Sequence, residues 1–128
     1  MMADQPAHLS PAGVVEAFMY QWSASDLSGV MPMPGVLPGS GVVELNSIGV
    51  PDAHQGKGYA SAALRMLTDL CDANGVTITL TPRPLPDQIV PGCTATRSIE
   101  ELASWYGRHG FEIVRPNEYT FDMIRRPR

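Results

Sequence analysis

The chain has few of the sequence features that stabilise small proteins without a large hydrophobic core, such as disulfides and metal sites. It also has few of those that direct proteins to a membrane or out of the cell. It has 128 residues and two cysteines, Cys71 and Cys93, too few for a disulfide framework and without the spacing of a metal site. We expect a reducing, cytoplasmic setting. No apolar stretch is long enough to span a bilayer. The first residues, MMADQPAHLS, also lack the basic and apolar segments of a signal peptide.

Charge of either sign is sparse as well. Charged residues make up 17% of the chain and the formal net charge is -4, which argues against nucleic acid or an anionic membrane as a partner. Basic residues are scattered except for Arg125, Arg126 and Arg128. Hydrophobic residues make up 44%, enough for one globular core, and we predict a single domain over 1–128.

Apolar spacing predicts helices that alternate with strands. Ser10 and Pro11 are typical of a helix start and favour a helix over 10–22, with a strand over 14–22 as the competing interpretation. Strands are expected at 42–50 and 76–80, with a helix from about 60 to 74 between them. Strand, helix and strand at this spacing predict a βαβ unit with parallel strands.

Glycine and proline interrupt the rest of the chain. Residues 23–41 are expected to form a mobile loop, or a short extended piece at 35–37 with a turn at 39–41. The connection 81–97 carries four prolines, and Ser98 with Glu101 forms a capping box that opens another helix. FEIV and YTFDMI then flank RPNE, which predicts a β-hairpin.

The stretch HQGKGYASAAL, residues 54–64, places two glycines between a predicted strand and a predicted helix. The first N–H groups of a helix lack intrahelical partners, so glycines here let an anion approach the backbone closely. A tight turn explains the glycines equally well. A Walker loop does not fit, because Gly58 follows Lys57. A dinucleotide-binding fingerprint does not fit, because Ser61 stands at its third glycine.

A third pattern does fit. QGKGYA at 55–60 matches the Q/R-x-x-G-x-G/A signature of the GNAT acyltransferases, and LASWYGRHGF at 102–111 resembles the second block of that family. FEIV and YTFDMIRRP resemble its closing hairpin. The resemblance covers about residues 42–126. It implies an α/β (α+β) fold with a mixed, splayed β-sheet, flanked by helices and ending in an antiparallel hairpin.

The resemblance also implies that the chain binds acetyl-CoA or another acyl-CoA, with no metal. The pyrophosphate would lie on the N–H groups of residues 56–60, and the pantetheine arm would lie between the two splayed strands. The N–H near Ile48 would donate to the thioester carbonyl and to the oxyanion that develops from it. The residues that it places at the cofactor are Ile48, Val50, Gln55, Gly56, Lys57, Gly58, Tyr59 and Ala60.

Two residues match the catalytic positions of the family. Tyr106 matches the tyrosine that protonates or hydrogen-bonds the leaving sulfur, although an aromatic on a buried helix face is the alternative. Glu44 matches a glutamate that some members use as a base through ordered water, although an exposed strand glutamate is the alternative. His54 is a rival base, and His109 lies near a helix C-terminus, where a cation is favoured. On a simple pleat Glu44 shares a face with Ile48, and a bulge would break that alternation.

The chain also departs from the family pattern. An asparagine that often contacts the cofactor arm is replaced by Ile99, and Ser98 beside it is expected only to cap the helix. Family members usually have two helices and three strands before the strand equivalent to 42–50, and at most one helix and one short strand fit here. The acceptor site is therefore expected to be open, or completed by a second subunit or by residues 81–97. An exposed sheet edge favours a homodimer.

We therefore expect an N-acyltransferase that moves an acetyl group from acetyl-CoA to a primary amine of a small molecule or protein. Direct attack is expected because no activated nucleophile is visible. One alternative is a non-catalytic module on a shortened GNAT scaffold that binds acyl-CoA or a protein partner. Another is a nucleotide-phosphate binder that uses the same turn. The sequence leaves the acceptor open.

Overall fold

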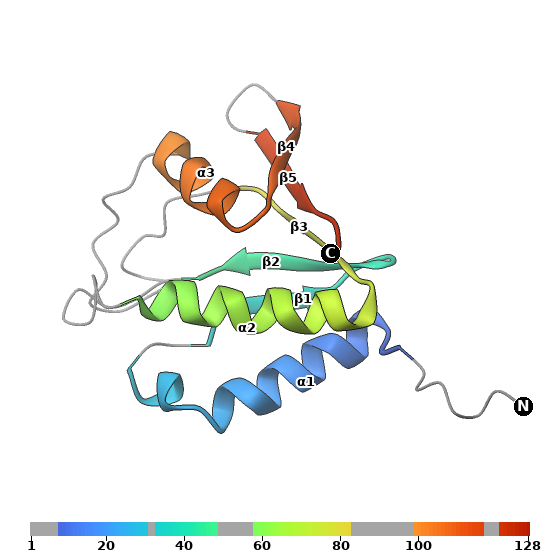
Figure 1. Ribbon diagram of the computed structural model, residues 1–128, viewed down its shortest axis with the longest axis vertical. Coiled ribbons are helices and arrows are strands. Elements are labelled where there is room, and N and C mark those ends of the chain that lie inside the picture. Colours follow the sequence, from blue (N-terminus) through green and yellow to red (C-terminus); the bar gives the residue numbers. More distant parts are fainter. Residues whose placement is uncertain (1–7, 31–32, 49–57, 83–98, 117–120) are drawn as a thin grey trace, which may run out of the picture.

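The computed structural model describes residues 8–30, 33–48, 58–82, 99–116 and 121–128. These ranges contain three helices, one short 3-10 helix and five strands (Figure 1). The helices are α1 (Pro11–Ser23), η2 (Asp26–Gly29), α2 (Tyr59–Asn74) and α3 (Ile99–Arg108). The strands are β1 (Gly35–Pro38), β2 (Val42–Ser47), β3 (Thr77–Leu80), β4 (Glu112–Pro116) and β5 (Phe121–Arg125).

The N-terminal segment is a helix, so the competing strand over 14–22 is wrong. The Ser10 side chain accepts a hydrogen bond from the Gly13 N–H at 3.2 Å and caps α1, and proline occupies the first turn. One stripe of the helix is buried, as its spacing predicts. That stripe consists of Val14, Val15, Phe18 and Trp22.

Helix α2 also follows its apolar pattern. It begins one residue before the predicted start and ends at Asn74, where Gly75 takes a left-handed φ of 67° and caps the helix. The buried side chains lie at helical spacing and include Ala63, Leu64, Leu67 and Cys71. Leu70 and Ala60 are half-buried and pack against the same core. The predicted strand, helix and strand are thus confirmed.

The five strands form one mixed sheet in the order β1-β2-β3-β5-β4. Only the pair β2–β3 is parallel among the described pairs, and β1–β2, β3–β5 and β4–β5 are antiparallel. The parallel pair is the one that α2 connects, as a βαβ unit requires. The sheet and its C-terminal hairpin confirm the predicted fold class.

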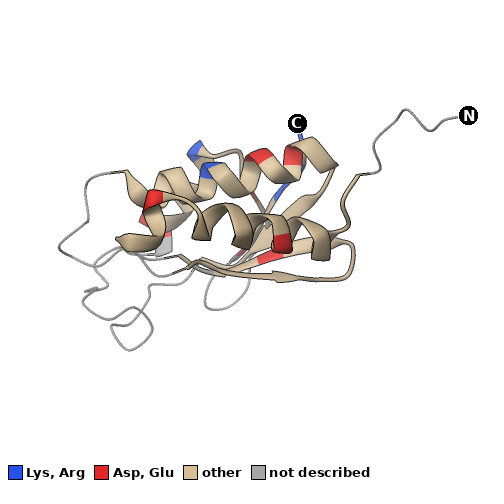
Figure 2. Ribbon diagram, turned by 90° about the horizontal axis from the view of Figure 1, so that it is seen from below, with Lys and Arg blue, Asp and Glu red and all other residues tan. Residues whose placement is uncertain are grey.

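Helices α1 and α2 lie on one side of this sheet (Figure 2), and α3 contributes Ala103 and Tyr106 to the same core. Alternate residues of the central strands, among them Val43, Leu45 and Ile78, are buried under the helices in a single core cluster. Glu44 and Asn46 are exposed and point to the opposite face. Among the residues that the structure describes, no helix covers that opposite face.

Strand β2 contains a bulge, which was the alternative to a simple pleat that the sequence did not decide. Gly35 of β1 faces Ser47 while Val36 faces Leu45, which leaves Asn46 as an extra residue in β2. Ile48, beyond the bulge, packs against the core. The simple pleat that put Ile48 on the face of Glu44 is therefore wrong.

The parallel pairing of β2 and β3 is short. It runs from Val42 and Thr77 to Leu45 and Leu80, and β2 continues to Ser47 without a partner in β3 among the described pairs. The strands diverge at this end, where Figure 1 shows β3 turning away from β2. This divergence is the predicted splay.

Arg125 is buried, unlike the two other arginines near the C-terminus, Arg126 and Arg128. Its side chain is 7% exposed, and its guanidinium forms a bidentate ion pair with Asp72 of α2, with Nη1–Oδ1 at 2.6 Å and Nη2–Oδ2 at 2.9 Å. Its Nε donates to the carbonyl of His109 at 2.8 Å. Arg125 therefore joins β5, α2 and the end of α3.

Candidate functional site

The start of α2 has the backbone conformation that the glycine-rich stretch predicts. Gly58 is the N-cap residue, has φ of 79°, and provides no side-chain capping hydrogen bond. A left-handed φ costs other L-residues free energy, which explains a glycine here. The first N–H groups of the helix follow at once, and a helix N-terminus attracts anions.

Part of the predicted cofactor contact set falls outside the described residues. This holds for Val50, Gln55, Gly56 and Lys57, and for the rival base His54. Tyr59 and Ala60 are described, half-buried, and packed against the core. The structure therefore shows the helix side of the predicted pyrophosphate site.

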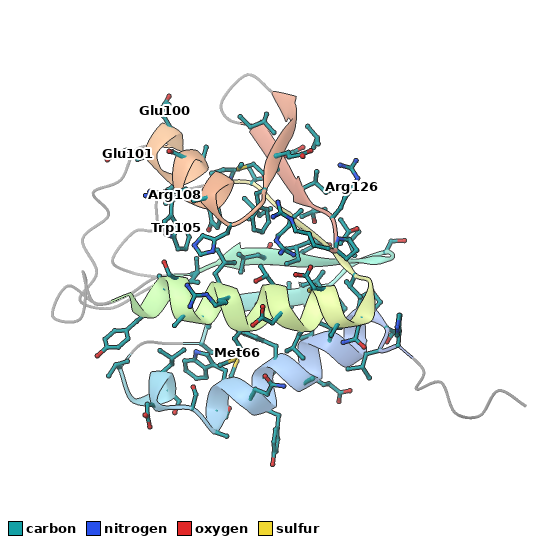
Figure 3. All side chains as sticks on the ribbon, in the orientation of Figure 1. Met66, Glu100, Glu101, Trp105, Arg108 and Arg126 are labelled. Carbon is teal, nitrogen blue, oxygen red and sulfur yellow. The ribbon has the colours of Figure 1, made fainter. Side chains whose placement is uncertain are left out.

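Helix α3 lies against the first turn of α2. The indole Nε1 of Trp105 donates to the Ser61 hydroxyl at 3.3 Å, and Figure 3 shows Trp105 projecting from α3 toward α2. Tyr106 is the next residue, with its ring centroid 4.9 Å from that of Trp105. The predicted tyrosine and the predicted pyrophosphate site thus lie on two helices in direct contact. Ser61, which the sequence marks only as a missing glycine, supplies that contact.

The environment of Tyr106 favours its neutral form. The side chain is 7% exposed and its ring lies 5.5 Å from the ring of Phe111 at an interplanar angle of 64°. Burial raises the pKa of its hydroxyl to about 12. The phenol, and not the phenolate, is therefore the form present at neutral pH, which is the form that a proton donor requires.

Glu44 lies on the uncovered face of the sheet, away from Tyr106. It lines a cavity of about 320 Å³ together with Asn46 and residues of β3, β4 and β5. Its carboxylate rests beside Gly39, where a Cβ would come within 2.5 Å of Oε2. The structure therefore places the two predicted catalytic residues on opposite faces of the sheet.

His109 does not fit the prediction of a favoured cation. Partial burial lowers the pKa of its ring, and the charges of Arg65, Arg108 and Arg125 lower it further. The ring also packs edge-on against Trp105 at 5.2 Å. The effect of the helix C-terminus is outweighed here, and the neutral imidazole is favoured.

The described part of the chain offers no cluster of three side chains that could ligate a metal. Cys71 is buried among the residues of the α2 stripe, and burial raises the pKa of its thiol to about 12. Such a thiol is a poor nucleophile. None of the described helices is long and apolar enough to cross a membrane.

Comparison with models of protein families identifies the family of this chain. A model of the acetyltransferase (GNAT) family matches residues 8–85, which include α1, the sheet through β3 and the Gly58 junction. The chain belongs to the GNAT family of acetyltransferases. No curated protein matches it. Members of this family generally use acetyl-CoA, so this GNAT chain is an acyl-CoA-dependent acetyltransferase at the level of its family.

The family match ends before α3. Tyr106 is therefore connected to the GNAT core by its contacts and by the motif that surrounds it, and its role stays a prediction. The same holds for Glu44 as a base. Asp122 and Thr81, which line the cavity beside β2, were not singled out from the sequence, because only the strand order brings them near Glu44.

Proposed function

We propose that this GNAT protein transfers an acetyl group from acetyl-CoA to a primary amine by direct attack. The observation that carries the proposal is the contact between Trp105 and Ser61. It holds the helix that carries a buried, protonated Tyr106 against the helix start that the signature marks as the pyrophosphate site. Family membership favours CoA over other nucleotides as the source of that pyrophosphate.

The reaction moves one proton from nitrogen to sulfur overall. The amine nitrogen attacks the thioester carbonyl carbon and gives up a proton, and the carbon–sulfur bond breaks as the thiolate leaves. Glu44 would accept the amine proton, directly or through water, once its side chain turns from Gly39 toward the cavity. Tyr106 would donate a proton to the sulfur.

The backbone of β2 supports the oxyanion step. The bulge at Asn46 and the loss of pairing with β3 beyond Leu45 bring Ile48 to the place where the strands separate. An N–H donor at this place would bond the thioester carbonyl more strongly as it becomes an oxyanion. Pro82 follows β3 and has no N–H that could pair with β2 here.

Calorimetry with acetyl-CoA and with CoA tests the first step. Binding is expected, and no binding at millimolar ligand overturns the proposal. Acetyl transfer to a panel of primary amines then tests the chemistry. Tyr106→Phe removes the hydroxyl with little change in shape, and kcat is expected to fall about 100-fold, the usual worth of general acid catalysis.

Glu44→Gln is expected to lower kcat by about the same factor. Its matched control is Glu16→Gln, an exposed glutamate of α1 on the helix side of the sheet, which should leave kcat unchanged. Binding of acetyl-CoA without transfer to any amine would instead indicate a non-catalytic acyl-CoA-binding module.

A further inference from the structure

The uncovered face of the sheet holds a cavity that the reaction above uses only at one end. It measures about 320 Å³ and spans β2, β3 and β5, with one residue from β4. Its described lining consists of Glu44, Asn46, Thr79, Leu80, Thr81, Val114, Asp122, Met123 and Ile124. This lining is part apolar and part polar, which is typical of a small-molecule site.

Cross-strand register fixes how the lining is arranged. Glu44 faces Thr79, which faces Ile124 on the next strand, so these three form one row across the cavity floor. Thr81 and Asp122 lie one row further along, where the Thr81 hydroxyl donates to Asp122 Oδ1 at 2.8 Å. The two carboxylates therefore stand at diagonal corners of the floor.

The separation of these corners follows from sheet geometry. Glu44 and Asp122 are two strands apart, at about 4.8 Å per strand, and two residues apart along the strand direction, at about 3.3 Å per residue. These two perpendicular distances put their Cα atoms roughly 12 Å apart. Side chains that reach inward shorten the gap between the carboxylates. Thr79 and Thr81 of β3 lie between these corners, and the apolar residues of the lining, Leu80, Val114, Met123 and Ile124, come from β3, β4 and β5. An extended ligand with a polar group at each end fits this floor.

The charges of the cavity lining determine which charge is favoured on the polar ends of the ligand. Both ionisable residues of the described lining are acidic, and none is basic. Arg126, which directly follows β5, is paired with Glu112 at 3.6 Å and does not line the cavity. Thr81 also orients the Asp122 carboxylate, which lowers the entropic cost of using it. A ligand with a positive charge at the Asp122 end is favoured.

We propose that this cavity binds a diamine, with one amine at Glu44 and the second, as an ammonium, at Asp122. The proposal rests on the proposed function for the fate of the first amine, which would be acetylated. The second amine supplies affinity and selectivity and does not react. The substrate class is thus a small aliphatic molecule with two amines, and a simple alkylamine would be a poor substrate.

Binding without turnover tests this inference separately from catalysis. Calorimetry in the presence of CoA compares the diamines from diaminopropane to diaminohexane with the alkylamines of matching length. At least one diamine is expected to bind about 10-fold more tightly than its alkylamine, the effect of one charge-assisted contact of roughly 1.4 kcal/mol. Equal binding of diamines and alkylamines across the series overturns the proposal.

Asp122→Asn keeps the acceptor for Thr81 and removes the charge. It is expected to abolish the preference for the diamine and to leave alkylamine binding unchanged. Asp69→Asn makes the same change of net charge on exposed α2 and should keep the preference. A preference that survives in Asp122→Asn places the second amine elsewhere and overturns the assignment. Diamine binding without acetyl transfer would sustain this site and overturn the proposed function.

Discussion

The ion pair between Arg125 and Asp72 gives the sharpest prediction about stability. We consider Asp72→Asn, which is close to isosteric and removes the negative charge. The Arg125 side chain, which is 7% exposed, would remain buried, and its guanidinium would keep two neutral acceptors, the His109 carbonyl and the amide oxygen of the new side chain. One amide N–H would also face it, because an asparagine has a donor where Asp72 has Oδ2.

The magnitude follows from the burial of the guanidinium. Removing one partner of a fully buried, hydrogen-bonded pair costs about 3–5 kcal/mol, because the remaining charge is left without compensation. Asp72 is 24% exposed, so we expect a loss at the lower end of this range. A domain of this size has a total stability of roughly 5–15 kcal/mol. The unfolding temperature should fall by about 10–20 °C, from the usual entropy of unfolding per residue. Asp72→Asn is therefore expected to be folded but fragile.

Urea unfolding followed by circular dichroism measures this loss, with Asp69→Asn on the same helix as the control. The hydrogen bond from Arg125 is the main cause that lowers the pKa of Asp72. A carboxyl whose pKa is lower in the folded state stabilises the fold above its unfolded pKa and loses that effect as the pH falls. The difference between wild type and Asp72→Asn should thus shrink below about pH 4. A loss under 1 kcal/mol at neutral pH would refute this reasoning.

Three further changes test other parts of the structure. Gly58→Ala should lower the free energy of unfolding by about 1–2 kcal/mol, and Gly58→Asn by less, because asparagine tolerates a left-handed φ; equal losses in urea would contradict the observed φ of 79°. Trp105→Phe should cost about 1 kcal/mol of hydrogen bonding, and adding Ser61→Ala to it should cost little more in a double-mutant cycle. Burial raises the pKa of Cys71 from 9.0 to about 12, so the native state holds this proton more tightly than the unfolded state does. The free energy of unfolding should therefore fall between about pH 9 and pH 12. Cys71→Ala should flatten that decline, and an unchanged slope would contradict this reasoning.

The sequence predicts the local elements of this fold well, because their signals are local. The cap at Ser10, the glycine at 75 and the spacing of apolar residues each act within one element, and the structure reproduces them. The start of α2 was predicted in the same way to within one residue. The splay between β2 and β3 came from the family resemblance and not from the pattern of residues.

What the sequence did not predict depends on contacts between distant segments. Arg125 resembles the exposed arginines beside it until β5 is placed next to β3, which brings it to Asp72. The same strand order brings Asp122 to the cavity of Glu44. His109 is surrounded by arginines from α2, α3 and β5, which no spacing along the chain reveals.

The strand order also determines how this chain must fold. The outer pairs β1–β2 and β4–β5 join neighbours in sequence, whereas the central pairs β2–β3 and β3–β5 join segments that are far apart. Non-local pairing is slow, because the entropy of closing a long loop is lost before the contacts form. The two ends of the sheet can therefore form early, while β3 joins them late. Folding rate should then depend on Ile78 and Leu80 at the centre of the sheet more than on any residue of either outer pair.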